Sequence, residues 1–171
     1  FWQISDSSGG LSQDYGETLA VAWDHQAGQG WQIYGAGTYD KSGLGVVPPS
    51  DKQWYHTAYV RSSGTSTLYI NGIAVISKSD THNYDGTYIA IGGYYTTSYL
   101  MGGKISNLRV VKGTAVYTSE FKPPTEPLTN ITNTKLLCCN NSSTTGSTVT
   151  PVTINSNGDP TASTDSTFDD P

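Results

Sequence analysis

The ten residues TLYINGIAVI, at positions 67–76, constrain the fold more than any other part of the sequence. Asn71-Gly72 separates two runs of apolar and β-branched residues, and this dipeptide between such runs is the strongest short-range signal for a two-residue β-hairpin. Residues 62–65, Ser-Ser-Gly-Thr, supply a second turn directly before the hairpin. The centre of the chain is therefore expected to consist of short strands joined by tight turns.

The same strand-like pattern continues along much of the chain. Segments rich in β-branched and aromatic residues, many of them alternating with period two, occur at 18–23, 30–34, 53–61, 66–71, 73–77, 87–92 and 104–112. No stretch of about ten residues shows the periodicity of a helix. Short strands with turns at this spacing predict an all-β fold, either a sandwich or a barrel.

The charge content and the lengths of the apolar runs argue against two kinds of partner, nucleic acids and membranes. Charged residues make up 13% of the chain, the net charge is −5, and Lys and Arg do not cluster. A nucleic-acid backbone would therefore find no basic patch to bind. No apolar run approaches the ~18 residues that a membrane-spanning helix needs, so we expect no membrane insertion.

The two cysteines are adjacent, Cys138 and Cys139. Neighbouring Cα atoms lie ~3.8 Å apart, whereas ordinary disulfides join Cα atoms ~4.4–6.8 Å apart. Two free thiols are therefore favoured, with a strained vicinal disulfide as the alternative. In a strand, one of the two thiols would face inward and the other outward.

Several segments together resemble a known family. QWYHTAYVRSSGTSTLYINGIAV is followed in order by YIAIGG, GGKISNLRVVKGTAVY, F-x-PPT-x-PL and NTKLL. This order resembles the laminin-G-like branch of the concanavalin A-like jelly rolls, over residues 53–139. The resemblance implies an antiparallel β-sandwich over residues 1–139, followed by a polar C-terminal strand and a tail or linker over 140–171.

The resemblance also implies a role for the stretch TAVYTSEF and the prolines after it. In the family, this stretch crosses the sandwich, so Val116, Tyr117 and Phe121 are expected as apolar pegs, and the prolines lead to a last strand, KLLCC. The family pattern normally begins with one more strand, before the part that FWQIS matches. We expect a longer parent polypeptide or a partner chain to supply that strand.

Concanavalin A-like folds include glycan hydrolases, so an enzyme has to be considered. Retaining glycosidases need two carboxylates ~5–5.5 Å apart. Glu17, Glu120 and Glu126 are the only glutamates, and none has an acidic residue two positions away. His56 alternates with Trp54 and is read as a histidine at the edge of the core. The sequence therefore predicts that the protein is not an enzyme.

The parity of the loops predicts a candidate metal site. If consecutive strands are antiparallel, alternate connections emerge on the same rim of the sandwich. Counting from 18–23 places one set of oxygen-bearing side chains on a single rim: Asp24, Asp80, Asn83 and Asp85. Calcium takes about six to eight oxygens of these kinds, and laminin-G-like relatives often hold it at a rim. The alternative is that these residues serve only as turn formers.

The same count places an aromatic cluster on the opposite rim, consisting of Tyr39, Tyr94, Tyr95 and Tyr99. A tyrosine combines an apolar ring with a polar tip, so it suits the C–H face and hydroxyl groups of a sugar. Tyrosines also mark protein–protein contacts. Glycan binding, a protein contact and plain strand packing all remain open.

Two functions follow from these observations. The C-terminal stretches LLCCNNSS and NGDPTAS resemble a variant found in tail-fibre and other virion proteins of marine tailed phages. The first interpretation is therefore a virion or extracellular module that contacts a glycan or a host receptor. The second is a structural fibre subunit that contacts copies of itself or other virion proteins.

Overall fold

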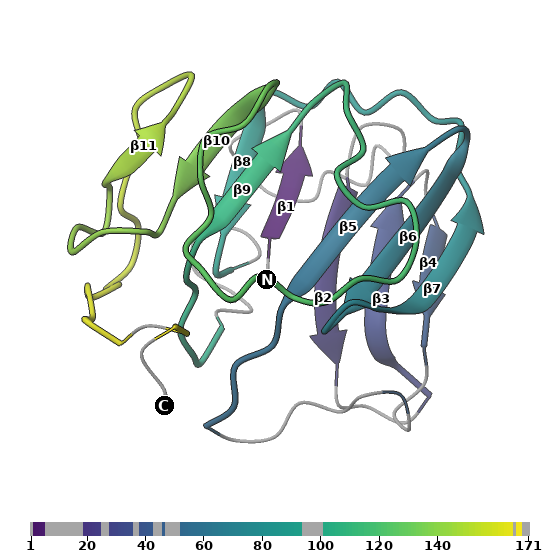
Figure 1. Ribbon diagram of the computed structural model, residues 1–171, viewed down its shortest axis with the longest axis horizontal. Coiled ribbons are helices and arrows are strands. Elements are labelled where there is room, and N and C mark those ends of the chain that lie inside the picture. Colours follow the sequence, from purple (N-terminus) through teal and green to yellow (C-terminus); the bar gives the residue numbers. More distant parts are fainter. Residues whose placement is uncertain are drawn as a thin grey trace. The chain divides into compact units, whose positions relative to one another are not determined.

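The computed structural model describes residues 2–5, 19–24, 28–35, 38–42, 46, 52–93, 101–165 and 167–168. The chain forms two compact units (Figure 1). The first contains Phe1–Met101 and Tyr117–Lys122, and the second contains Gly102–Val116 and Pro123–Pro171. The described parts contain strands and no helix, so they include no helix that could cross a membrane. The predicted all-β class is confirmed.

The first unit contains a five-stranded antiparallel sheet, with the strand order β4-β3-β2-β1-β8. Its strands are β1 (Trp2–Ser5), β2 (Leu19–Asp24), β3 (Gly30–Gly35), β4 (Thr38–Lys41) and β8 (Tyr88–Ile91). The central strand β2 reads LAVAWD, and its alternation places Leu19 and Val21 on one face and Ala20 and Ala22 on the other.

A three-stranded antiparallel sheet completes the first unit, in the order β5-β6-β7. Its strands are β5 (Thr57–Ser62), β6 (Thr65–Ile70) and β7 (Ile73–Ser79). The turn between β6 and β7 is Asn71-Gly72, with φ angles of 51° and 82°. Positive φ at both central positions is what a two-residue type I′ hairpin requires. The predicted hairpin is therefore confirmed.

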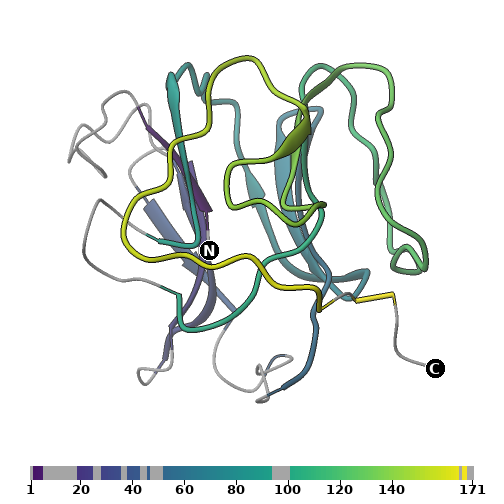
Figure 2. The same ribbon diagram turned by 90° about the vertical axis from the view of Figure 1, so that its left-hand side faces the viewer.

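The core lies between these two sheets, which form two layers when seen edge-on (Figure 2). Leu19, Val21, Trp31 and Ile33 come from the five-stranded sheet, and Leu68, Ile70 and Ile76 come from the three-stranded sheet. Burying each of these side chains contributes about 1.5–3 kcal/mol to the free energy of folding. The predicted β-sandwich is thus the structure of the first unit.

Residues 117–122, which we call the strap, cover the non-core face of the three-stranded sheet. Tyr117 and Phe121 stack with their ring centroids 3.6 Å apart, and the Phe121 ring lies 5.5 Å from that of Tyr69. The Phe121 amide donates a hydrogen bond to the Gly72 carbonyl oxygen at 3.1 Å. A Cβ atom on residue 72 would overlap the carbonyl oxygen of Phe121, so this turn requires glycine for the strap as well as for φ.

The strap confirms two of the three predicted pegs. Phe121 also packs edge-on against His56, with the ring centroids 5.4 Å apart. Val116 is instead exposed and belongs to the second unit. The prediction for Val116 is therefore wrong, because the docked part of TAVYTSEF begins one residue later, at Tyr117.

The second unit contains a three-stranded antiparallel sheet with the order β11-β10-β9. Its strands are β9 (Leu108–Val111), β10 (Thr134–Cys138) and β11 (Ser147–Val149). β9 is shorter than the predicted strand 104–112, because Asn107 has a φ of 53° and interrupts the extended backbone directly before Leu108. β11 comes from the C-terminal stretch that the sequence predicted to contain a polar strand.

Candidate functional site

β4 changes the predicted grouping of the loops. The consecutive strand-like segments at 30–34 and 53–61 predicted a single connection over residues 35–52. In the structure, Thr38–Lys41 form a strand that pairs with β3. An additional antiparallel strand reverses the rim on which every later loop emerges. Asp24 pairs with Gly30 at one end of β3, whereas the Lys78 Nζ atom donates to the carbonyl oxygen of Gly35 at the other end.

The predicted metal residues are therefore not brought together. The Tyr84 hydroxyl occupies the space that a Cβ on Gly35 would need, so the loop after β7 lies at the far end of β3 from Asp24. Asn83 and Asp85 in that loop are exposed. The described residues contain no group of three or more His, Cys, Asp or Glu side chains placed to hold a metal ion. Calcium stays a prediction without a described site.

Asp80 is the most tightly bound acidic side chain of this loop. It is 4% exposed, and its Oδ2 atom accepts hydrogen bonds from Ser66 Oγ at 2.6 Å, the Tyr84 hydroxyl at 3.0 Å and the Tyr59 hydroxyl at 3.3 Å. Its Oδ1 atom accepts from the His82 amide at 3.1 Å. The carboxylate thus joins β5, β6 and the loop that leaves β7.

This environment lowers the pKa of the Asp80 carboxyl group and raises the pKa values of the two phenols. Burial acts to raise the pKa of Asp80, but the hydrogen bonds from Ser66, Tyr84, His82 and Tyr59 outweigh burial and leave the pKa below its ordinary value. Burial raises the pKa of Tyr59 to about 12, and burial together with the hydrogen bond to Asp80 raises the pKa of Tyr84 as well. Asp80 is therefore ionised and both phenols are neutral at pH 7.

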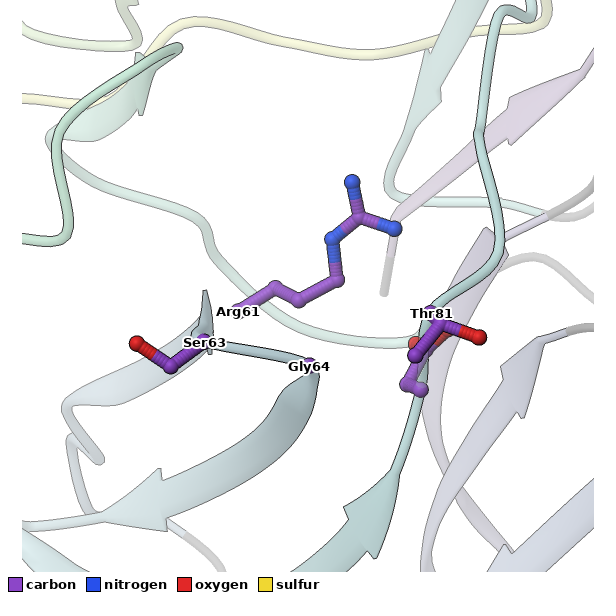
Figure 3. Close-up of a pocket in the computed structure, with 5 residues that line it drawn as sticks. Arg61, Ser63, Gly64 and Thr81 are labelled. Carbon is purple, nitrogen blue, oxygen red and sulfur yellow. The ribbon is translucent and has the colours of Figure 1, made fainter.

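An open hollow of about 400 Å³ lies beside Asp80, lined by Arg61, Ser63, Gly64, Asp80 and Thr81. Figure 3 shows that the Arg61 side chain extends across this hollow, while the Ser63 hydroxyl points away from it. The Arg61 guanidinium lies 5.4 Å from the centroid of the Tyr84 ring, a cation–π distance. Arg61 therefore helps to hold the loop, and the hollow offers a ligand one cationic group.

A second candidate surface is the face of the five-stranded sheet that points away from the core. The strand registers align Tyr39, Tyr34, Ala20, Gln3 and Ala90 in one line across all five strands. We call this line the outer row. Directly paired residues lie on the same face of a sheet, and the residues that alternate with the row, such as Val21 and Ile33, belong to the core. The outer row therefore lies on the face opposite the core.

One end of the outer row is open and its middle is buried. Tyr39 is 54% exposed, and its ring centroid lies 4.4 Å from that of the buried Tyr34. Gln3 is 3% exposed, and its buried Oε1 atom has no hydrogen-bond partner among the residues that the structure describes. Buried amide oxygens are usually paired. Gln3 is therefore a buried acceptor that an outside hydroxyl group could satisfy only if the groups that cover it move.

The neighbouring positions complete the chemistry of this face. Ala20 and Ala90 flank Gln3 and leave a floor of small side chains beside it. Gln32, in the adjacent line, donates its amide to Gln29 Oε1 at 3.0 Å. An exposed aromatic ring, small side chains and amide groups on one face suit a ligand that has an apolar face and hydroxyl groups.

The outer row includes one residue from the predicted tyrosine cluster. Tyr39 lies at its open end next to Tyr34, in strand β4 rather than in the rim loop where the sequence analysis placed it. Tyr94, Tyr95 and Tyr99 lie outside the described residues. Sequence reasoning missed Gln3, although its alternation with Trp2 and Ile4 could have placed it on the face opposite the core.

A comparison with models of known protein families gives independent evidence about the class of this chain. The family described as the concanavalin A-like lectin/glucanases superfamily matches residues 2–117. The chain belongs to this superfamily. No curated protein and no solved structure matches the chain. The concanavalin A-like match begins at β1 and ends in the strap, so it covers N-terminal strands that the sequence pattern matched only loosely.

Membership of the concanavalin A-like superfamily supports a carbohydrate- or protein-binding module. Both kinds of ligand need an accessible surface with defined side-chain positions. In the described part of the first unit, the outer row places the exposed ring of Tyr39 at one end of a line of buried side chains that includes Tyr34 and Gln3. It is therefore the candidate site.

Proposed function

We propose that the chain is a non-catalytic module that binds a glycan through the outer row. The observation that carries this proposal is the exposed ring of Tyr39, which packs on Tyr34 at the open end of the outer row. The Tyr39 ring would stack on the C–H face of a sugar ring, held in place by Tyr34. The Gln3 Oε1 atom, three strands along the row from Tyr39, would accept a hydrogen bond from a hydroxyl of a longer oligosaccharide after the groups that bury it move aside.

The placement of the acidic residues supports a binding role rather than hydrolysis. Glu120 lies in the strap and Glu126 lies in the proline-rich stretch, and both side chains are exposed outside the strands. Asp80 is ionised and accepts hydrogen bonds from four donors, so it is a poor proton donor at neutral pH. The proposal therefore assigns no catalytic residue.

The proposed setting is a virion fibre or a similar surface appendage. The resemblance of LLCCNNSS and NGDPTAS to virion proteins of marine tailed phages supports this setting. A module of this kind would contact a host glycan or receptor outside the cell. The virion assignment rests on that resemblance, whereas the glycan proposal rests on the outer row.

One observation favours assembly as a second candidate function. β8 is the last strand of the five-stranded sheet, and it carries Tyr88 at 49% exposure and Ile89 at 38% exposure. An edge strand with exposed apolar side chains can pair with a strand of another chain. In that case the module would contact copies of itself or other fibre proteins. The concentration dependence of the sedimentation coefficient distinguishes this assembly from a monomeric glycan binder.

Replacing Tyr39 by Ala is expected to weaken glycan binding by about 1–2 kcal/mol, roughly 5- to 30-fold, because a central stacking ring is lost. The free energy of unfolding should fall by about 1 kcal/mol or less, since the ring is largely exposed. A glycan array identifies the ligand, and titration calorimetry measures the affinity of each variant.

Ile73→Ala is the matched control for this prediction, because Ile73 is 53% exposed on the other sheet. Its affinity for the same glycan should equal that of the wild type. Equal affinities for all three proteins would show that Tyr39 does not contact the ligand, and the outer row would lose its main support.

A further inference from the structure

Cys138 and Cys139 place two thiols next to each other at the end of β10. Their Sγ atoms lie 3.8 Å apart, and neither cysteine is in a disulfide. Cys138 is buried, whereas Cys139 is half-buried and has a φ of 56°. The free thiols favoured by the sequence are thus present in the structure, close enough for one sulfur to attack the other.

The two thiols differ in reactivity. The hydrogen bond between the two sulfurs lowers the pKa of Cys139, although partial burial opposes this. The same interaction with Cys139, together with burial, raises the pKa of Cys138. Thiolates react with oxidants, and exposure decides access to the sulfur. Cys139 is therefore the thiol that ionises first and that solvent reaches more easily.

We propose that Cys139 is a site of reversible oxidation by hydroperoxides and that Cys138 resolves it to a vicinal disulfide. The Cys139 thiolate attacks the terminal oxygen of the hydroperoxide and the O–O bond breaks, which gives a sulfenic acid. The departing alkoxide, or hydroxide when the oxidant is hydrogen peroxide, takes a proton from water and leaves as the alcohol or as water. The Cys138 sulfur then attacks the Cys139 sulfur, and the departing hydroxide takes the Cys138 proton to leave as water. Two electrons pass from the two sulfurs to the peroxide.

The covalent geometry of the pair makes the product reversible. Adjacent Cα atoms lie ~3.8 Å apart, below the range of ordinary disulfides, so the closed ring is strained and easily reduced. Strained disulfides are the labile ones in thiol exchange. A small thiol reductant should therefore restore both thiols.

The backbone at this pair connects two parts of the second unit. The Asn107 amide donates to the carbonyl oxygen of Cys139 at 2.8 Å, and the Asn107 Oδ1 atom accepts from the Leu128 amide at 3.1 Å. Closing the ring has to change the backbone between Cys138 and Cys139. Oxidation is therefore expected to weaken the bond at Asn107 and to loosen the stretch around Leu128.

The test treats the whole chain with hydrogen peroxide and follows its intact mass and free thiols. The expected product is a monomer about 2 Da lighter, with no free thiol, which a thiol reductant returns to the starting mass. Amide exchange at Asn107 should become at least about fivefold faster in the oxidised form. A product that is a disulfide-linked dimer, or that stops at sulfinic acid, would overturn the proposal.

Single replacements separate the roles of the two thiols. Cys139→Ser should react at least about tenfold more slowly than the wild type, because the reactive thiolate is lost. Cys138→Ala and Cys138→Ser should instead accumulate a sulfenic acid that dimedone traps. Two variants are used because Cys138 is buried, and thermal unfolding checks that each one folds. Equal oxidation rates for the Cys138 and Cys139 variants would contradict the assigned roles. The intact mass of the oxidised wild-type chain shows, independently of the variants, whether the disulfide forms.

Discussion

Asp80→Asn is expected to lower the free energy of unfolding by about 3 kcal/mol at pH 7. Asparagine has nearly the same shape, but it places an amide where Oδ2 now accepts from Ser66, Tyr84 and Tyr59. Those hydroxyl groups would lose a charged acceptor in a buried position. Urea unfolding measures the change.

Asp85→Asn is the matched control, because Asp85 lies in the same loop and is exposed. Its free energy of unfolding should stay within about 0.5 kcal/mol of the wild type. If the two variants lose the same stability, the buried network is not what holds the loop to β5 and β6.

The pH dependence gives an independent check of the same network. The pKa of Asp80 is lower in the folded state than in the unfolded state, so its contribution is present above the unfolded pKa of about 4 and is lost as the pH falls through the folded value. The stability difference between the wild type and Asp80→Asn should therefore shrink below about pH 4. A difference that stays constant from pH 7 to pH 2 would contradict the assignment.

The phenol of Tyr59 makes the stability of the fold depend on pH at alkaline pH. The pKa of Tyr59 is raised to about 12 in the folded state. Its contribution is therefore present below the unfolded value of about 10 and is lost as the pH rises toward 12. Burial of the ring is the main cause, so this alkaline loss should persist in Asp80→Asn.

Phe121→Ala is expected to lower the free energy of unfolding of the first unit by about 2–4 kcal/mol. The replacement removes the ring that stacks on Tyr117 and packs against Tyr69 and His56. Tyr69 is buried at present, so losing the strap would open its ring to water. Urea unfolding, followed by the near-UV circular dichroism of the aromatic side chains, measures both effects.

Glu120→Ala is the control for the strap, because Glu120 precedes Phe121 and its side chain is exposed. It should leave the stability within about 0.5 kcal/mol of the wild type. A Phe121→Ala protein as stable as this control would show that the strap is not part of the packed first unit.

The sequence predicted the features that local chemistry determines. Asn71-Gly72 requires two positive φ angles, and few other dipeptides allow them, so the hairpin could be placed to the residue. The all-β class followed from segments rich in β-branched and aromatic residues, none of which has the period of a helix. These predictions needed no information from distant parts of the chain.

Features that depend on distant contacts could not be predicted in this way. β4 reads TYDK, which has too little apolar alternation to mark a strand, and it is held by pairing with β3 and by the ion pair of Asp40 with Lys78 at 2.6 Å. Because this strand was missed, the predicted rims were wrong, and Asp24 was grouped with Asp80 although the structure places them at opposite ends of β3. The outer row likewise exists only through the registers of five strands, so the alternation of Gln3 with Trp2 and Ile4 could indicate its face but not its neighbours in the row.

The most direct test of glycan binding at the outer row is a chemical-shift map of the ¹⁵N-labelled chain, titrated with the oligosaccharide that binds best on the array. The account predicts that the shifted amides cluster at Gln3, Ala20, Tyr34, Tyr39 and Ala90, with little change at the strap. The absence of any glycan that binds on the array would contradict it. Shifts confined to the three-stranded sheet or to the second unit would contradict it as well.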